Sequence, residues 1–221
     1  MDIQYYKYPR TPHLPWSPGA TSDDIRIIDT AHFEGKEVVA SVKKDGESTS
    51  LYADGKIHAR SIDSKSHPSR DWIKRVAAEI SYELPAGWRI SLENLYAEHT
   101  IHYYKLRQYA EVIAIWDEMN FCLSWDTILE WCELLGLVPV DVIYRGIYNE
   151  AHIKSLYSKF DKNGDLMEGY VVRVVDGFSY SNFSMSVAKY VASEFKENME
   201  ANGDKHWTEK HKYGIITNTL A

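Results

Sequence analysis

The sequence has few cysteines and no long hydrophobic runs. Cys122 and Cys132 are the two cysteines among 221 residues, and their spacing fits neither a disulfide framework nor a zinc knuckle. The longest apolar runs, 112–116 and 134–140, are far shorter than the roughly 20 residues that cross a bilayer. The N-terminus shows neither a secretory signal nor a transit peptide. We therefore expect buried reduced thiols, no membrane attachment and a cytoplasmic protein.

Positively charged residues are also fewer than negatively charged ones. Lys and Arg number 25 against 32 Asp and Glu, which gives a formal net charge of −7. An acidic total argues against indiscriminate binding of nucleic acid, although a local basic groove can still bind it. With 44% hydrophobic and 26% charged residues, the composition is that of a globular protein. It excludes disordered, collagen-like and coiled-coil proteins.

Proline is concentrated at one end of the chain. Four of the seven prolines lie in residues 1–24, together with several aromatic residues. Because proline fixes φ and restricts the residue before it, this region is predicted to be an extended strap laid over a domain. A disordered tail is the alternative. Residues 25–221 contain no linker-like break and are predicted to form one domain.

Strand and helix patterns alternate irregularly along that domain. Asp54-Gly55 between two β-prone runs predicts a hairpin. In the first helix, Trp72, Val76 and Ile80 recur at helical spacing and are predicted to face the core. Further strands are predicted over 37–43, 88–95, 111–116 and 169–175, and helices over 69–83, 125–135 and 149–160. These patterns predict an α+β fold with antiparallel sheets flanked by helices.

A cluster of charged residues, Lys43-Lys44-Asp45-Gly46-Glu47, ends the strand predicted over 37–43. A lysine is nucleophilic only when it is deprotonated, and a strand end can desolvate it or place cations beside it. Lys43 is therefore a candidate nucleophile, with Lys44 and a bound divalent metal supplying a positive field. A solvent-exposed charged turn is the alternative interpretation.

Four more charged residues stand where the pattern predicts packing. They are Arg60, Glu93, Glu168 and Lys189. Charged groups in apolar surroundings must be paired, bind a metal or serve a ligand. A structural ion pair can account for any one of them, whereas all four together favour a functional site.

Taken in order, these residues resemble the ATP-dependent RNA ligase family of covalent nucleotidyltransferases. The motifs are Lys43-x-Asp45-Gly46, Arg60-Ser61, Glu93-Asn94-Leu95, Glu168-Gly169-Tyr170-Val171-Val172-Arg173 and Lys189-Tyr190-Val191. With the flanking stretches, the resemblance covers residues 7–207. It implies a nucleotidyltransferase fold with two antiparallel sheets flanked by helices. About thirty residues follow Lys189, too few for the C-terminal oligonucleotide-binding barrel of larger relatives, so no such domain is expected.

The resemblance also implies a reaction in three steps. Lys43 attacks the α-phosphate of ATP to form a lysyl-AMP, the AMP moves to an RNA 5′-phosphate, and a 3′-hydroxyl displaces it. The implied cofactors are ATP and Mg²⁺ or Mn²⁺, and the implied partner is RNA with 5′-phosphate and 3′-hydroxyl ends, as in RNA repair. Such chemistry depends mainly on positioning and charge neutralisation. A nick, a broken tRNA loop and a single strand all stay open as substrates.

The same resemblance assigns the catalytic roles. Lys43 is expected to be the nucleophile, and Lys189 to hold the α-phosphate of ATP. Asp45 is expected to support the metal or the incoming hydroxyl, and Glu168 to serve the metal.

The resemblance also implies contacts with the nucleotide, and this sequence departs from the family pattern at three positions. Arg60 and Glu93 are expected to contact ribose and phosphate. Ile113 stands where an adenine-stacking aromatic residue is usual, and it can still pack against a purine by dispersion. Val42 replaces a frequent glutamate, and Ala192 lies where a second basic residue is common. These departures leave open an adenylyltransferase with a non-RNA acceptor, or an inactive nucleic-acid-binding relative.

Three other patterns have simpler explanations. His99 and His102 could ligate a metal, but no third ligand at zinc spacing completes the set, so packing or hydrogen bonding is expected. The run at 161–165 resembles a calcium loop, but its glycine is misplaced and the closing glutamate is missing, so a turn is expected. The basic C-terminal residues Lys205, Lys210 and Lys212 could contact RNA phosphates or form a solvated surface.

Overall fold

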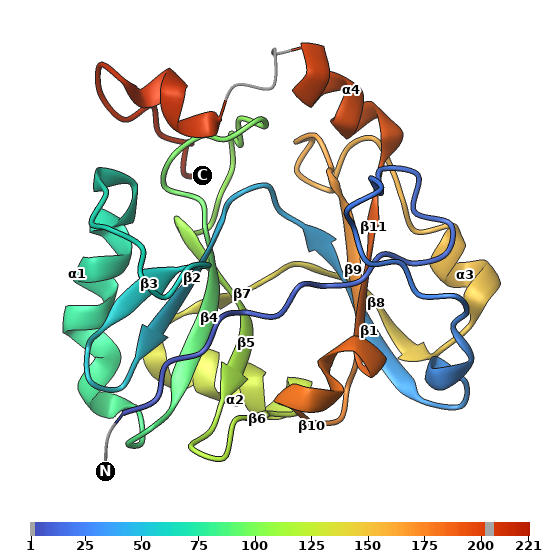
Figure 1. The fold of residues 1–221 in the computed structure, drawn as a ribbon, viewed down its shortest axis with the longest axis horizontal. Helices are drawn as coiled ribbons and strands as arrows, with labels where there is room; N and C mark the ends of the chain where they lie inside the picture. Colours follow the sequence, from blue (N-terminus) through green and yellow to red (C-terminus); the bar gives the residue numbers. More distant parts are fainter. Residues whose placement is uncertain (1–2, 202–205) are drawn as a thin grey trace.

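The computed structural model describes residues 3–201 and 206–221, which fold around two sheets that stand side by side (Figure 1). The smaller sheet has four antiparallel strands in the order β11-β9-β1-β8. Its strands are β1 (Glu37–Lys43), β8 (Val142–Ile147), β9 (Gly169–Val174) and β11 (Val187–Val191). The β1 strand, in the middle of this sheet, is buried from Val38 to Val42, which explains its almost continuous apolar sequence.

The larger sheet has seven strands, in the order β10-β6-β5-β4-β2-β3 with β7 beside β5. They are β2 (Glu47–Tyr52), β3 (Ile57–Ala59), β4 (Arg89–Asn94), β5 (Ala110–Trp116), β6 (Phe121–Cys122), β7 (Val138–Pro139) and β10 (Phe178–Ser179). The β5–β7 pairing is parallel, and every other pairing in this sheet is antiparallel. The predicted α+β class with two antiparallel sheets is therefore confirmed, with one short parallel addition.

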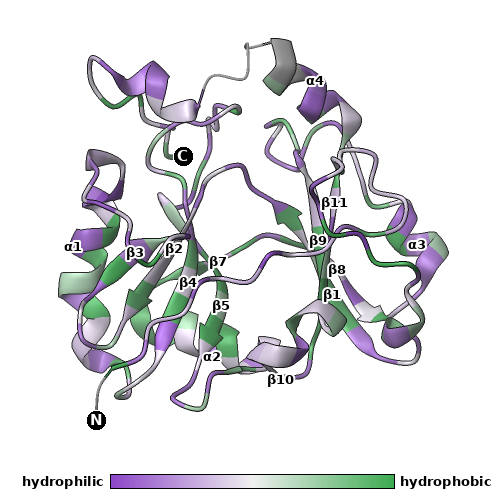
Figure 2. Ribbon diagram, in the orientation of Figure 1, coloured by the Kyte–Doolittle hydropathy of each residue, from purple (hydrophilic) through white to green (hydrophobic). Residues whose placement is uncertain are grey.

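In the described part of the chain, four α-helices and several 3-10 turns surround the sheets. The helices are α1 (Asp71–Ile80), α2 (Trp125–Leu135), α3 (Glu150–Lys154) and α4 (Ser193–Ala201). The 3-10 turns span Ala31–Phe33, Pro68–Arg70, Ser81–Glu83, Tyr180–Met185 and Trp207–His211. Helix α1 contacts β2 and β3, and α2 contacts β5 and β7. Hydrophobic residues concentrate on the strands and the inner helix faces (Figure 2). No helix in the described part of the chain is long and apolar enough to cross a membrane.

The predicted hairpin and the second helix are confirmed. Gly55 has φ 84° in the turn between β2 and β3. Ser124 caps α2 by accepting a hydrogen bond from the Thr127 amide, and Gly136 ends the helix with φ 67°. Left-handed φ values of this kind favour glycine at both positions.

The buried face predicted for the first helix is partly wrong. Helix α1 buries Ile73, Ala77 and Ile80, whereas Trp72 and Val76 are half-buried at its edge. At 100° per residue, positions i and i+8 differ by about 80° around the helix, whereas i and i+7 differ by about 20°. The stripe at 73, 77 and 80 therefore follows one face more closely.

The helix predicted over 149–160 is much shorter than expected. Helix α3 ends at Lys154, and the Ser155 hydroxyl donates to the His152 carbonyl in the last turn. Phe160 is half exposed and forms an isolated bridge with Leu166, which makes a small hairpin of the following turn. A local side-chain hydrogen bond thus competes with continuation of the helix.

The N-terminal residues run extended across the face between the two sheets (Figure 1). The Tyr6 amide donates to the Tyr52 hydroxyl of the larger sheet. At the smaller sheet, the Leu14 amide donates to the Lys189 carbonyl, and the Lys189 amide donates to the Pro12 carbonyl. The strap therefore joins both sheets and covers the edge strand β11.

Candidate active site

A cavity of about 560 Å³ is lined by residues of both sheets. It brings together all five residues that the sequence predicts to contact a nucleotide, namely Lys43, Arg60, Glu93, Ile113 and Lys189. Asp45 and Glu168 adjoin Lys43 at the ends of β1 and β9, so all seven predicted site residues lie in one region.

Lys43 is the last residue of β1, and its Nζ lies 2.7 Å from Glu168 Oε2. Glu168 immediately precedes β9, whose first residue Gly169 pairs with Lys43. Burial lowers the pKa of Lys43, but the carboxylates of Glu168 and Glu93 together raise it above its ordinary value. Lys43 is therefore a protonated ammonium in the unliganded protein.

Asp45 and Glu93 are held by backbone amides. The amides of Thr100 and Ile101 donate to Asp45 Oδ2 at 2.7 and 2.8 Å. The Gly46 amide donates to Glu93 Oε1 at 3.0 Å. A Cβ on Gly46 would lie 2.6 Å from the Asn94 carbonyl oxygen, which explains why glycine is needed in this motif.

The carboxyl groups around Lys43 carry more negative charge than the lysine compensates. Burial raises the pKa of Asp45 to about 7, and the charge of Glu168 adds to this effect. Burial raises the pKa of Glu93 to about 8, partly opposed by Lys43. Three carboxyl groups thus share one nearby amine, and the site is destabilised when all three are ionised.

This surplus of carboxylates fits a hard divalent cation, which prefers oxygen ligands. Asp45, Glu93 and Glu168 each use one oxygen in the contacts given above, and the described residues provide no hydrogen bond to the other oxygen. The described residues contain no preformed cluster of three or more metal-binding side chains. The chemistry of the donors therefore fits a cation that binds together with a phosphate-bearing ligand.

Lys44 does not play the part that the sequence suggests. Its side chain is buried, its Nζ forms an ion pair with Asp161 at 3.1 Å, and it lies 4.6 Å from the centre of the Tyr103 ring. The expectation that Lys44 supplies a positive field at Lys43 is wrong because Asp161 compensates its charge.

Lys189 is a second cation near Lys43 in the cavity. Burial and the nearby charge of Lys43 lower its pKa. Its ammonium has no hydrogen-bond or ion-pair partner among residues 3–201 and 206–221. An unpaired, half-buried ammonium in a cavity favours an anionic ligand.

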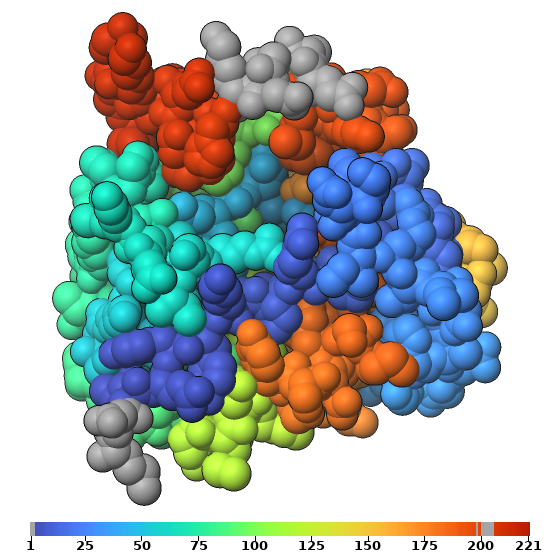
Figure 3. Space-filling model, viewed as in Figure 1, coloured from blue at the N-terminus to red at the C-terminus, as the bar shows by residue number. Residues whose placement is uncertain are grey.

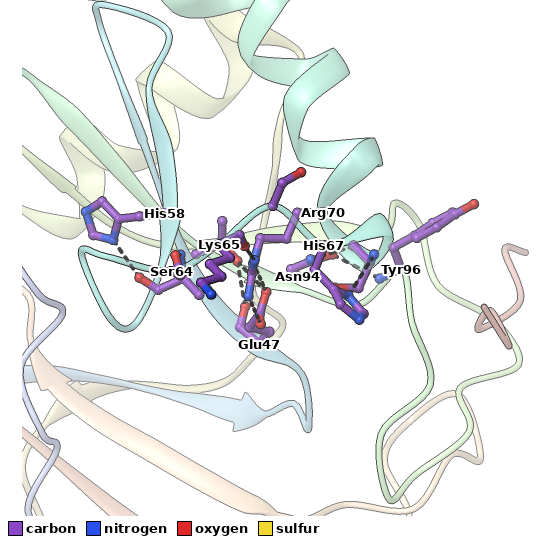
Figure 4. A network of polar contacts seen from close by, with 12 residues as sticks. Glu47, His58, Ser64, Lys65, His67, Arg70, Asn94 and Tyr96 are labelled. Carbon is purple, nitrogen blue, oxygen red and sulfur yellow. Dashed lines mark hydrogen bonds and ion pairs between the residues drawn. The ribbon is translucent and has the colours of Figure 1, made fainter. Parts of the chain in front are cut away.

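An ion pair that the sequence did not reveal holds one wall of the cavity (Figure 4). Arg70 donates through Nε and Nη2 to the two oxygens of Glu47, each at 2.7 Å. Glu47 lines the cavity. Asn94 Nδ2 donates to the Ser69 carbonyl and fixes the turn that carries Arg70. Arg70 lies 23 positions from Glu47 and outside every motif, so no local signal pointed to it.

The C-terminal segment supports the Asp45 site from behind. The buried Asn218 accepts the Tyr103 amide at 2.9 Å and donates to the Leu95 carbonyl at 2.8 Å. The Tyr103 hydroxyl in turn accepts the Asp45 amide at 2.7 Å. The tail therefore braces the loop that positions Asp45, a role that no sequence pattern indicated.

His99 and His102 have separate partners in the structure. His99 stacks on Trp207 with ring centroids 4.1 Å apart, and both line the cavity. Burial, with smaller contributions from neighbouring cations, lowers the pKa of His99 to about 3. His102 instead pairs through Nδ1 with Glu98 at 2.5 Å.

Of the three patterns that were given simpler explanations, the histidines and the run at 161–165 agree with them, and the basic C-terminal residues are only partly described. At 161–165, the Asp161 carboxylate accepts the amides of Asn163 and Asp165, which confirms a turn. Of the basic tail, Lys210 is paired with Glu98 at 2.8 Å. Lys205 lies outside the described residues.

The region that contains these motifs matches a known protein family. The sequence model of the family described as RNA ligase matches residues 36–191. No curated protein sequence matches significantly.

Among solved structures, an apo Naegleria gruberi RNA ligase variant matches with a TM-score of 0.59 and 15% identity, over 78% of this chain and 54% of that one. A variant of that ligase with ATP and Mn matches with a TM-score of 0.59 and 13% identity, over 89% of this chain and 63% of that one. A third, with AMP and Mn, matches with a TM-score of 0.57 and 13% identity, over 77% and 54%. The chain thus spans little more than half the length of these ligases, and the likeness shows a shared fold.

Proposed function

Because the chain belongs to the RNA ligase family, we propose that it is an ATP-dependent RNA ligase that joins 5′-phosphate and 3′-hydroxyl ends through a lysyl-AMP. The observation that carries this proposal is the convergence of Lys43, Arg60, Glu93, Ile113 and Lys189 on one cavity. In sequence these residues are spread over four of the motifs and the strand that carries Ile113, so structural ion pairs do not account for their meeting around one space.

In the first step, the neutral Lys43 amine attacks the α-phosphorus of ATP. A P–N bond forms, the bond from the α-phosphorus to the bridging oxygen breaks, and pyrophosphate leaves. Lys43 must first lose the proton that the neighbouring carboxylates stabilise. Lys189 would hold the α-phosphate, and its unpaired ammonium in the same cavity supports this role. A bound Mg²⁺ or Mn²⁺ at Asp45 and Glu168 would neutralise carboxylate and phosphate charge and so lower the pKa of Lys43.

The cavity walls divide between the base and the sugar-phosphate part of the nucleotide. Ile113 from β5 and Val171 from β9 offer apolar surface on the two sheets. A purine between them would be held by dispersion and by burial of its faces. Arg60 and Glu93, which both line the cavity, would contact phosphate and ribose.

The remaining steps return the lysine to its starting state. An RNA 5′-phosphate oxygen attacks the α-phosphorus, the P–N bond breaks, and Lys43 leaves as an amine. A 3′-hydroxyl then attacks the 5′-phosphate, AMP leaves, and the hydroxyl proton passes to solvent or to Asp45. Asp45 suits this role because its pKa of about 7 lies near neutral pH.

The domain limits, the cation and the cellular role are also part of the proposal. We assign residues 1–24 as the strap and residues 25–221 as the catalytic domain. Mg²⁺ is the proposed cation, and cytoplasmic RNA repair is the proposed role.

A chase experiment tests the proposal. The protein is first labelled with α-³²P-ATP and Mg²⁺, freed of ATP, and then mixed with RNA that carries a 5′-phosphate or a 5′-hydroxyl. Transfer of label to the 5′-phosphate RNA, with release of AMP when a 3′-hydroxyl end is supplied, supports a ligase. Label that stays on the protein would instead favour an adenylyltransferase with another acceptor, and no label at all would favour an inactive relative.

A further inference from the structure

A second hollow of about 620 Å³ lies beside the mouth of the cavity. Its walls come from the strap, from the turn after β3 and from Tyr180. Figure 3 shows the dark-blue strap crossing this face between the cyan and orange segments, with the molecule hollowed beside it. We refer to this hollow, lined by Lys7, Tyr8, Pro9, Arg10, Arg60, Ser61 and Tyr180, as the strap groove.

The strap groove is positively charged although the protein is acidic. Lys7, Arg10 and Arg60 line it, and its lining contains no Asp or Glu. All three are exposed. None of these cationic groups has a hydrogen-bond or ion-pair partner among the described residues. In a chain with a formal net charge of −7, three unpaired cations around one groove favour a ligand that carries several negative charges.

The groove also leads into the cavity. Tyr8, Pro9 and Arg60 line both spaces. A strand whose terminal phosphate lay against Lys43 could therefore leave the cavity past Arg60 and lie along Lys7 and Arg10. A compact ligand such as free phosphate would not need to occupy both spaces.

The groove walls are held in place before any ligand binds. The Tyr180 hydroxyl donates to the Lys7 carbonyl at 2.7 Å, which ties the strap to the turn after β10. Tyr8 packs edge-on against Phe183, with ring centroids 5.3 Å apart. Fixed aromatic rings beside unpaired cations are the combination that binds single-stranded nucleic acid, through base stacking and phosphate contacts.

We propose that the strap groove binds the first nucleotides of the RNA strand whose 5′-phosphate reacts at Lys43. The proposal rests on the proposed ligase function and adds to it the path of one substrate strand. The cations contact backbone phosphates, and the tyrosines offer surfaces to bases, so the groove selects single-stranded RNA near the end without reading its sequence.

The test measures RNA binding apart from nucleotide chemistry. A single-stranded RNA 12-mer with a 5′-phosphate and a 3′-fluorescein is titrated with protein by fluorescence anisotropy at several salt concentrations. The variants are Lys7→Ala, Arg10→Ala and the two combined. Lys36→Ala is the control, since Lys36 is an exposed cation next to the start of β1, at the opposite end of that strand from Lys43.

The double variant is expected to bind RNA at least tenfold more weakly than the wild type. Its slope of log affinity against log salt should fall by about 1.4, since each phosphate contact contributes about 0.7 for a single strand. Lys36→Ala should change the affinity by less than about twofold, because a distant surface charge is screened.

An unchanged RNA affinity and salt slope in the double variant would overturn the proposal, as would wild-type protein that does not bind the RNA. A raised KM for ATP in lysyl-AMP formation, with RNA affinity intact, would assign the groove to the triphosphate of ATP and overturn it too. Lysyl-AMP formation is measured on the same proteins without RNA. Failure of that reaction in the wild type would count against the proposed function, whereas the binding result would still decide the groove.

Discussion

Lys43 Nζ and Glu168 Oε2 lie 2.7 Å apart, although 125 positions separate the two residues in the sequence. The antiparallel pairing of β1 and β9 makes them neighbours, because Lys43 ends one strand and Glu168 directly precedes the other. The contact raises the pKa of Lys43 and so favours its protonated form, which is unreactive. Lys43, the proposed nucleophile, would therefore react only after a ligand changes the charge around it.

Glu168→Gln should make Lys43 more reactive toward a simple amine reagent. Glu168 raises the pKa of Lys43, so the variant has a lower lysine pKa and more neutral amine at a given pH. Competitive labelling with acetic anhydride from pH 7 to 10, read by peptide mass spectrometry, measures this pKa. Lys36 in the same digest is the internal control. A titration curve for Lys43 that is identical in the two proteins would contradict the account.

Asn218→Ala should lower both stability and lysyl-AMP formation. The substitution leaves the Tyr103 amide and the Leu95 carbonyl without their buried partner, at a cost of about 2 kcal/mol in the free energy of unfolding. Loss of the brace behind Asp45 should reduce the rate of lysyl-AMP formation roughly tenfold. Urea denaturation and label incorporation at 15 °C check the two effects separately.

Tyr213→Ala is the matched control, because Tyr213 lies in the same segment but is 95% exposed. It should leave both quantities near the wild-type values. An Asn218→Ala protein that is destabilised but fully active at 15 °C would limit Asn218 to a structural role.

Arg70→Gln should destabilise the protein more than the double variant Glu47→Gln/Arg70→Gln. In the native pair the side chain of Glu47 is only 13% exposed and that of Arg70 only 11%. The single change therefore leaves a largely buried carboxylate at Glu47 without its guanidinium partner. Breaking one side of such a pair costs about 3 kcal/mol, whereas removing both charges costs less. A double-mutant cycle by urea denaturation measures the difference. Additive effects of the two single changes would show that the pair is not coupled.

Glu111 should make stability fall as the pH rises. This residue is buried, its Oε2 has no partner among the described residues, and burial raises its pKa to about 7. The folded protein then keeps a proton at Glu111 over a pH range in which the unfolded chain has lost it. The contribution of Glu111 to the free energy of unfolding therefore decreases from about pH 4.5 to about pH 7, by up to about 3 kcal/mol, and levels off above that.

Glu111→Gln removes this titration and should make the fall in stability between pH 4.5 and pH 7 shallower, while the raised pKa values of Asp45 and Glu93 continue to contribute in both proteins. Urea denaturation of both proteins at half-unit intervals from pH 4.5 to 8.5 gives the comparison. Parallel profiles for the two proteins would show that Glu111 does not titrate as described.

Local patterns were enough to predict strands β1 to β5 and β9 and one complete helix, whereas β8 and the two-residue strands were not predicted. The apolar run of β1, the Asp54-Gly55 turn and the Ser124 cap with Gly136 each act within a few residues, so the sequence carries their signal directly. The helix predicted over 149–160 failed because a competing hydrogen bond at Ser155 ends α3 early. Such competition depends on tertiary context as well as on spacing.

The residues of the site could be predicted from the sequence, but the contacts between them could not. Motif resemblance found Lys43 and Glu168, but the contact between them depends on the pairing of distant strands. The same holds for Lys44, whose partner Asp161 lies 117 positions away. Asn218 was missed because a buried asparagine has no pattern that distinguishes it from an exposed one.

The most direct test of the central claim is covalent labelling of Lys43. Wild-type protein, Lys43→Ala, Lys43→Arg and the control Lys36→Ala are incubated with α-³²P-ATP and Mg²⁺, after pyrophosphate treatment to remove any AMP already bound, and run on a denaturing gel. The account predicts a labelled band in the wild type and in Lys36→Ala, and none in either Lys43 variant. A wild-type protein that takes up no label, or a Lys43→Ala protein that still does, would contradict it.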